Sequence, residues 1–343
     1  MKKINIFILL TTISNSLSLI FLPFILLNNN YNLKEIIFFF ILVYFYSIIN
    51  LLLLRYFNSI KIKYFYTFTF LIFLILLYKI NNYIIYFLAS YFYSLYMSLY
   101  FTIKNILSIK NIKKQRNNSK IYIIFTLFGV ILGTIFYYLN IFNNKYLIIL
   151  FNFIIMLISL LLIINKYNYS YNKVHKIRIN TIIFLFFEQF KYIIITFSSL
   201  YIYINLNSKI KYIVIINILS YLSSIFVLLS KKEKRYNYNI IVILISILFI
   251  IKFNINNKNI LLIIIFFEGI LRYLLENISM NKIYIESNLN TIVDYSTIIE
   301  LIKNIFRFII LFTFYLFNIN LYYILILSSI CFLLSIIIKY DNT

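Results

Sequence analysis

Charged residues of both signs lie inside otherwise apolar stretches in the second half of this chain. Within FFEGILRYLLEN, Glu268, Arg272 and Glu276 follow one another at four-residue intervals, which places them on one face of a helix. Acids and bases in such surroundings can form ion pairs, and a carboxylate that is desolvated at intervals can bind and release a proton. The complete set of embedded charges is Glu188, Lys191, Glu268, Arg272, Glu276, Glu300, Lys303 and Arg307.

The embedded charges are predicted to meet at matching depths. At a rise of about 1.5 Å per residue, Glu268 and Arg307 both lie roughly 16 Å from the predicted cytoplasmic ends of their apolar segments. We therefore expect these two residues to pair in at least one state. We expect Arg272 to lie between acids, and these acids are Glu188, Glu276 and Glu300.

Glu300, Lys303 and Arg307 form a second stripe at three- and four-residue intervals, and both charged stripes should face the protein interior. A charge facing lipid costs about 2.5 to 3.5 kcal/mol on insertion scales, so intramembrane charges are a functional-site hypothesis. The alternative is a structural ion network that only orients three helices.

The composition sets the class of protein that must hold these charges. With 63% hydrophobic and 12% charged residues, a chain of 343 residues is too apolar for a soluble globule, so we expect an integral membrane protein. The single cysteine, Cys331, excludes internal disulfides and cysteine-based metal clusters. The single histidine, His175, lies among basic loop residues and has no assigned role. We expect no cofactor and no bound metal.

Apolar segments of roughly 20 residues, the length that crosses a bilayer, recur along the whole chain. Twelve can be placed, and the predicted fold class is an all-α polytopic membrane protein. Their ranges are 4–27, 35–54, 62–80, 83–103, 121–139, 147–165, 181–204, 210–230, 238–254, 259–279, 297–317 and 320–338.

The connections between these segments differ in charge. When they are assigned alternately to two sides, the side with both termini receives roughly three times as many Lys and Arg residues, which fits the positive-inside rule. The opposite side receives Lys34, Lys79, Lys145, Lys209, Lys211, Lys252 and Lys258. We therefore place the chain in the plasma (inner) membrane with both termini cytoplasmic. Topology explains the net charge of +23, so we expect no nucleic-acid partner.

The longest central connection, 166–180, divides the chain into two halves. We predict a six-helix bundle over 1–165, a cytoplasmic linker over 166–180 and a second six-helix bundle over 181–343, packed around a central cavity. We expect a monomer.

Twelve spans in this plan resemble the major facilitator superfamily of secondary transporters. The stretch LLLLRYFNSIKIKYF is similar to the short basic loop of that family, which implies a gating role for Arg55, Lys61 and Lys63. FGVILGTIF, with Gly129 and Gly133, resembles the glycine-rich motif of the family's exporters. The stretch MNKIYIESNLNTIVDYSTIIELIKNIFRFII resembles the eleventh span of its multidrug-type members and the loop before it.

Several further polar residues in the first half have two interpretations. Gly129 and Gly133 form a small-xxx-small pair, which favours helix packing. Thr12 and Asn15, in a first span rich in polar groups, and Ser94, in the fourth span, could line a cavity or allow close helix approach.

Three classes of function are consistent with these patterns. The first is a secondary transporter that moves a small solute by alternating access, coupled to protons and directed outward as an exporter. The second is a lipid-linked saccharide flippase or related exporter, which would need a charged cavity contributed by both halves. The third is a membrane-embedded transferase, which needs a His or Asp cluster that the sequence lacks, so we expect no enzyme activity.

Overall fold

The computed structural model describes residues 6, 9–14, 22–56, 62–80, 82–114, 127–135, 150–158, 177–206, 210–229, 237–285 and 292–337. All regular elements among them are helices, as the sequence predicted. The helices with full bounds are α2 (Leu22–Asn28), α3 (Leu33–Tyr56), α4 (Ile62–Tyr78), α5 (Tyr83–Lys114), α8 (Ile179–Asn205), α9 (Ile210–Leu229), α10 (Tyr238–Asn254), α11 (Lys258–Ile285), α12 (Ile292–Leu316), α13 (Leu321–Leu333) and the short 3₁₀ helix η2 (Leu334–Ile337). Helical residues also occupy 9–14, 127–135 and 150–158.

Asparagines begin many of these helices. The Asn side chain in the N-cap position accepts a hydrogen bond from a backbone N–H of the first turn, a group that has no partner within the helix. At α3 the cap is reciprocal: the Glu35 N–H donates to Asn32 Oδ1 at 2.9 Å, and the Asn32 N–H donates to Glu35 Oε2 at 2.7 Å. The asparagines that cap helices in this way are Asn32, Asn82, Asn237, Asn257 and Asn320.

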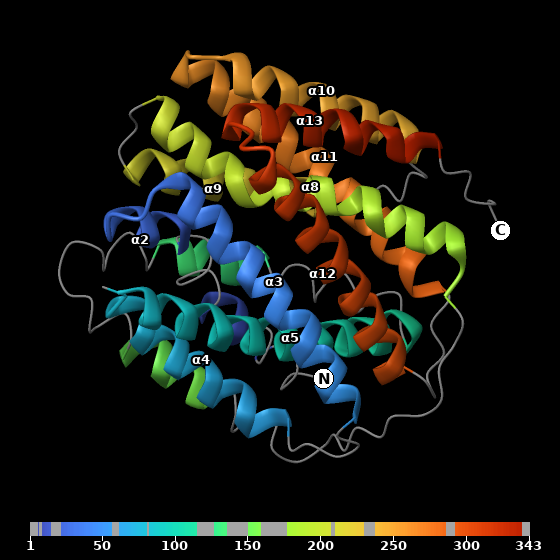
Figure 1. The fold of residues 1–343 in the computed structure, drawn as a ribbon. Coiled ribbons are helices and arrows are strands. Elements are labelled where there is room, and N and C mark those ends of the chain that lie inside the picture. The colour runs from blue at the N-terminus through green and yellow to red at the C-terminus, as the bar shows by residue number, and fades with distance from the viewer. Residues whose placement is uncertain are drawn as a thin grey trace. The chain divides into compact units, whose positions relative to one another are not determined.

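The helices form two compact units. The first comprises Met1–His175 and Ser287–Tyr315. Within it α5 packs against both α3 and α4 (Figure 1). Aromatic rings fill the contact between α4 and α5, where the ring centroids of Phe70 and Tyr96 are 4.4 Å apart and those of Phe73 and Tyr93 are 4.8 Å apart. Such ring pairs stabilise the contact beyond their buried area.

Helix α12 also belongs to the first unit, although it follows the central connection in the sequence. Ring pairs tie it to α3 at two levels: Phe38 to Tyr315, with centroids 5.5 Å apart, and Phe45 to Phe308, with centroids 5.8 Å apart. The division into consecutive halves at 166–180 stays a prediction. Within this unit, a helix from beyond that connection is packed on helices that precede it.

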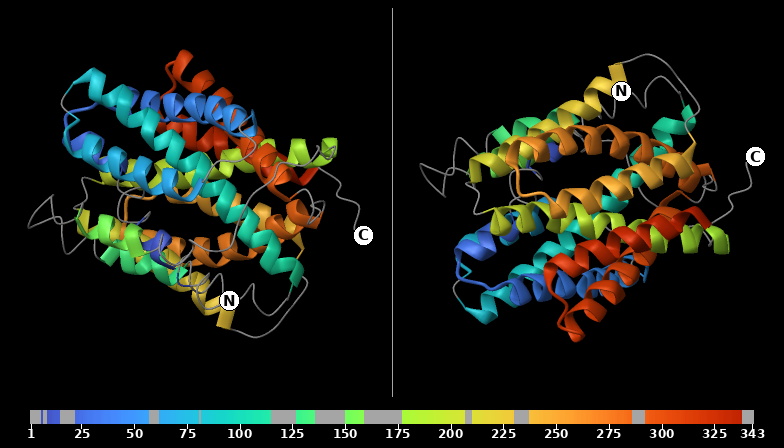
Figure 2. Two further views of the ribbon diagram at one scale, coloured as in Figure 1. Left: turned by 90° about the horizontal axis from the view of Figure 1, so that it is seen from below. Right: turned by 90° about the horizontal axis from the view of Figure 1, so that it is seen from above.

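The second unit comprises Lys176–Glu286 and Leu316–Thr343. Its helix α11 packs against α9 and α10, and α13 packs against α8 and α10, as the two views of Figure 2 allow the reader to follow. Tyrosine hydroxyls bind groups on neighbouring helices within this unit. Tyr322 donates to Asn254 Oδ1 at 2.8 Å, and Tyr201 donates to the Phe253 carbonyl at 3.2 Å.

Three of the described helices are long and apolar enough to cross a membrane: Leu33–Leu54, Tyr83–Ile106 and Ile179–Asn205. Shorter apolar helices occupy Phe68–Leu77, Tyr212–Val227, Tyr238–Asn254 and Leu321–Ile337. Large apolar side chains on these helices are exposed, for example Phe226 at 68% and Ile240 at 55%. Exposed apolar faces on apolar helices are what a lipid environment requires, so the chain is a multi-pass membrane protein.

Candidate functional site

The most buried ion pair among the described residues of the second unit joins Glu268 on α11 to Lys252 on α10, with Nζ 2.7 Å from Oε2. Both side chains are buried, and the lysine ammonium also lies over the rings of Phe249 and Phe253, 5.7 Å and 5.6 Å from their centroids. Lys252 was predicted to lie in an outer connection, and this is wrong. The basic residue lies inside α10, where it neutralises Glu268.

The direction of helical side chains explains how Lys252 and Glu268 meet. Side chains on a helix tilt toward its N-terminus. Because α10 and α11 follow one another across a three-residue connection, 255–257, they run in opposite directions. Lys252, near the end of α10, therefore reaches back along the hairpin, and Glu268, about ten residues into α11 at about 1.5 Å per residue, reaches toward it.

Arg272 lies roughly midway along α11, one turn after Glu268. Its guanidinium is buried and sits over the ring of Tyr221 on α9, 5.0 Å from the centroid. The third member of the stripe, Glu276, is exposed. The expectation that all three charges face inward is therefore wrong for Glu276, because a helical face drifts by about 80° over eight residues of 3.6-residue periodicity.

Glu188 and Lys191 form a second buried ion pair in this unit, within one turn of α8, with Nζ 2.5 Å from Oε2. The other carboxylate oxygen accepts a hydrogen bond from Ser279 Oγ of α11 at 3.0 Å. Ser279 was not predicted, because its neighbours in the sequence gave no sign that it faces a carboxylate.

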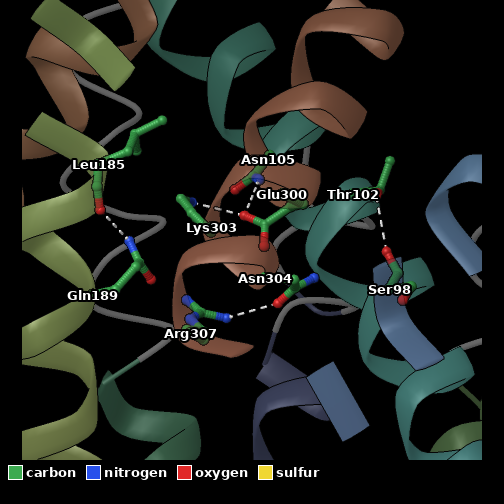
Figure 3. Close-up of polar contacts among 9 residues, drawn as sticks. All are labelled: Ser98, Thr102, Asn105, Leu185, Gln189, Glu300, Lys303, Asn304 and Arg307. Atoms are coloured by element: carbon green, nitrogen blue, oxygen red, sulfur yellow. Dashed lines mark hydrogen bonds and ion pairs between the residues drawn. The ribbon is translucent and has the colours of Figure 1, made fainter. Parts of the chain in front are cut away.

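The first unit holds a third acid-centred cluster, on α12 and α5 (Figure 3). Glu300 Oε1 accepts hydrogen bonds from Lys303 Nζ and from Asn105 Nδ2, both at 2.7 Å. Glu300 and Asn105 are almost fully buried, with 2% and 3% of their surface exposed. Asn105 was not predicted, and its position on the face of α5 that carries Ser98 and Thr102 is the signal that could have found it.

Arg307 lies two turns after Glu300 on the same face of α12. Its Nη1 donates to Asn304 Oδ1 at 3.3 Å (Figure 3). Its guanidinium lies over the ring of Tyr44 on α3, 5.6 Å from the centroid. The predicted contact of Arg307 with Glu268 stays a prediction, because in this structure Glu268 binds Lys252.

Hydroxyl side chains line one face of α5 toward the Asn105 end. Ser94 accepts a hydrogen bond from Asn50 Nδ2 of α3 at 2.9 Å. Ser98 and Thr102 each donate to the backbone carbonyl one turn earlier at 2.8 Å, which satisfies these hydroxyls inside the helix bundle.

Glycines mark two close helix approaches. A Cβ atom at Gly129 would clash with Oγ1 of Thr12. A Cβ atom at Gly269 would clash with Ser223 Oγ and with the backbone of Ser220 on α9. Ser224 Oγ also donates to the Gly269 carbonyl at 2.9 Å. Thr12 thus lies at a helix contact, and Gly269, which the sequence analysis passed over, fixes α9 against α11 beside Glu268.

Some predicted residues cannot be placed. Asn15 and Lys61 lie outside the described residues, as do the side chains of Arg55 and Lys63. Gly133 lies in a described helical segment, 127–135. In the described part of the chain there is no group of three His, Cys, Asp or Glu side chains that could hold a metal ion.

No protein-family profile matches the sequence, and no curated protein sequence matches it. Solved structures do match along nearly the full length. A bacterial homologue of the iron transporter ferroportin, in its outward-facing state, is 12% identical with a TM-score of 0.71, covering 98% of this chain and 97% of its own. The human organic anion transporter is 9% identical with a TM-score of 0.67, covering 98% of both chains. The Escherichia coli fucose:proton symporter is 14% identical with a TM-score of 0.60, covering 98% of this chain and 97% of its own.

These matches define the class of fold. The chain has the fold of transporters of the major facilitator type, which confirms the resemblance found in the sequence and the predicted all-helical, polytopic class. At sequence identities of 9–14% the similarity shows the fold alone, and the function has to be argued from this chain's own residues.

Proposed function

We propose that this protein is a secondary active transporter, that it moves a small solute across the plasma membrane by alternating access, and that the movement is coupled to protons. The fold supports transport. The buried ion pairs support coupling, since charges inside membrane helices are energetically costly and for that reason usually mark functional sites. In this proposal both termini are cytoplasmic, as the positive-inside rule indicates.

The observation that carries the proposal is the hydrogen bond from Asn105 to Glu300. Asn105 lies on α5, before the central connection, and Glu300 lies on α12, after it. Alternating access moves one set of helices against the other. Although both helices belong to one compact unit in this structure, they come from the two parts of the sequence, and a bond between them is the kind of contact that such a movement makes and breaks.

This geometry gives Glu300 a way to exchange protons. With Lys303 and Asn105 both donating to it, the carboxylate is stabilised as an anion in a site that water hardly reaches. When α12 moves away from α5, the Asn105 donor is lost, and a proton can take its place on the carboxylate. Solute movement and proton movement are then linked through one set of contacts.

Glu300 replaces Glu268 as the leading coupling residue. Glu268 is bound within the α10–α11 hairpin, and Glu188 is bound chiefly by its own helix neighbour Lys191, so neither bond has to change when α12 moves against α5. We assign Glu268 and Lys252 a structural role. Lys303 and Arg307 keep their proposed place beside the coupling carboxylate.

The solved relatives carry unlike cargoes, including iron, organic anions, nucleosides and fucose, so the fold leaves the substrate open. A transition metal is disfavoured here because the whole sequence has one His and one Cys, the side chains that such metals prefer. The paired glycines Gly129 and Gly133, which resemble an exporter motif, favour export as the direction.

Purified protein in liposomes that contain a pH-sensitive dye tests the proposal. A panel of organic anions, nucleosides and sugars is added outside, and proton movement across the membrane is recorded. We expect at least one solute to drive a proton flux that empty liposomes do not show. Transport of a solute with no accompanying proton flux would refute the coupling, and no transport of any solute would refute the function.

A further inference from the structure

The buried arginine of the second unit differs from the buried lysines in its partner. Within the described residues, the ion pairs closer than 4.0 Å that involve embedded acids are Lys191–Glu188, Lys252–Glu268 and Lys303–Glu300. Each of them is made by a lysine. Arg272 instead has its guanidinium over an aromatic ring, that of Tyr221, at 5.0 Å from the centroid.

The acids nearest to Arg272 along α11 interact with it electrostatically, but among the described residues neither forms an ion pair with it within 4.0 Å. Glu268, one turn before it, is bound to Lys252 at 2.7 Å. Glu276, one turn after it, is exposed. Arg272 itself is 9% exposed and lies roughly midway along α11. A guanidinium in that position is desolvated, and it keeps donors that the tyrosine ring satisfies only in part.

The position of Arg272 is fixed by the backbone around it. Gly269, three residues earlier, allows α11 to approach the Ser220 backbone of α9, and Ser224 donates to the Gly269 carbonyl at 2.9 Å. This crossing holds Tyr221 on α9 and Arg272 on α11 in one geometry. A fixed donor group inside an otherwise apolar helix is what a solute-binding site requires.

We propose that Arg272 binds the negatively charged group of the transported solute, and that the solute is a small organic anion with a carboxylate or a phosphate group. The planar guanidinium matches either group with two parallel hydrogen bonds, which are stronger than the contact with the ring of Tyr221. The ring keeps the guanidinium in place and stacks on it while the anion binds. This inference rests on the proposed transport function and narrows its substrate.

Ligand-induced stabilisation of the purified protein tests the inference. The probes are benzoate, lactate and glycerol 3-phosphate, each with an uncharged counterpart: benzamide, lactamide and glycerol. The readout is the fraction that stays monodisperse in size-exclusion chromatography after heating, measured over a range of probe concentrations. We expect at least one anion to stabilise the protein and its uncharged counterpart to have no effect, because a ligand stabilises the state that it binds.

Substitution of Arg272 then locates the effect. Arg272→Gln should abolish the stabilisation by the anion, whereas Arg178→Gln should leave it unchanged. Arg178 is a matched control because it is an exposed arginine of the same unit. Arg272→Lys keeps the charge without the two-pronged geometry, and we expect the apparent affinity for the anion to fall about tenfold.

Several results would overturn the inference. The first is that no anion stabilises the protein, and the second is that an uncharged counterpart stabilises it equally. The third is an unchanged anion affinity in Arg272→Lys, and this measurement decides the case if Arg272→Gln does not fold. Failure of this inference is distinguishable from failure of the transport proposal. A sugar or nucleoside that drives proton flux in liposomes would leave transport standing with a different substrate.

Discussion

Removal of one partner of the Lys252–Glu268 pair should destabilise the protein far more than removal of both. The two groups are 2.7 Å apart, and 4% of each residue is exposed. Lys252→Met leaves an unpaired carboxylate in the hairpin, at a cost of about 3–5 kcal/mol for a stranded buried charge. Lys252→Met combined with Glu268→Leu removes both charges, and a buried pair replaced by apolar side chains is neutral within about 1–2 kcal/mol.

The two single variants should differ from each other. Lys252 lies two residues before the end of α10 at Asn254, so after Glu268→Gln its long side chain can turn toward the helix end and reach water. Glu268 is short and lies well inside α11, so after Lys252→Met its charge has no such route. We expect Glu268→Gln to cost about half as much as Lys252→Met, roughly 1–3 kcal/mol.

Thermal unfolding in detergent, followed by circular dichroism, measures these differences. The chain has no tryptophan, so intrinsic tryptophan fluorescence cannot be used. At about 3 °C per kcal/mol, Lys252→Met should lower the midpoint by on the order of 10 °C and the double variant by only a few degrees. A double variant as unstable as Lys252→Met, or single variants as stable as the parent, would show that the pair does not hold the hairpin.

Three further predictions follow from other features of the chain. Gly269→Ala should lower stability by about 1–3 kcal/mol in the same assay, because the new methyl would clash with the backbone oxygen of Ser220, whereas Gly129→Ala should cost less because its closest contact is the rotatable hydroxyl of Thr12 and the nearest backbone atom, the Leu9 oxygen, is 3.0 Å away. Glu35→Ala should cost about 1–2 kcal/mol by removing the reciprocal cap of α3 and a hydrogen bond from Tyr83, and Glu35→Gln should retain most of that stability. Reporter fusions after Arg116 and Lys176 should be cytoplasmic and those after Asn143 and Asn256 external, and an external central connection would contradict the twelve-span topology.

The helix positions could be predicted from the sequence because membrane spans leave a strong signal. The segment 238–254 coincides with α10, and the segments 35–54 and 210–230 fall within two residues of α3 and α9. A span must be apolar over its full length, so its bounds are visible without any partner. Helices α5 and α11 continue past the predicted ends because only their apolar part was counted.

The asparagine caps were accessible to sequence reasoning but were passed over. The abundance of Asn in this chain made each one look uninformative. An Asn that directly precedes an apolar segment nevertheless has a physical role, because its side chain satisfies the first free N–H groups of the helix. Asn237 and Asn320 stand directly before α10 and α13.

The partners of the embedded charges could not be predicted in the same way. Depth along a helix follows from counting residues, but it does not say which neighbouring helix stands opposite. Depth favoured Arg307 for Glu268, and this contact stays a prediction; the structure shows the carboxylate of Glu268 bound to Lys252 of its own hairpin, because these two side chains tilt toward each other. Asn105 was missed for a related reason, since a neutral amide gives no charge signal until its acidic partner is known.

Comparison of solute exchange with proton-driven accumulation in the Glu300→Gln variant tests the central claim most directly. The solute is one that drives proton flux in the parent protein, and both rates are measured in the same liposomes, normalised to folded protein. The glutamine keeps the shape and the hydrogen bond from Asn105 but cannot exchange a proton. We predict that the rate of exchange with solute on both sides stays within about twofold of the parent rate. That limit corresponds to a change in activation free energy well below the value of about 1.4 kcal/mol that changes a rate tenfold. Accumulation driven by a pH gradient should be lost. Accumulation equal to that of the parent, or an equal loss of both rates, would contradict the role of Glu300 as the coupling carboxylate.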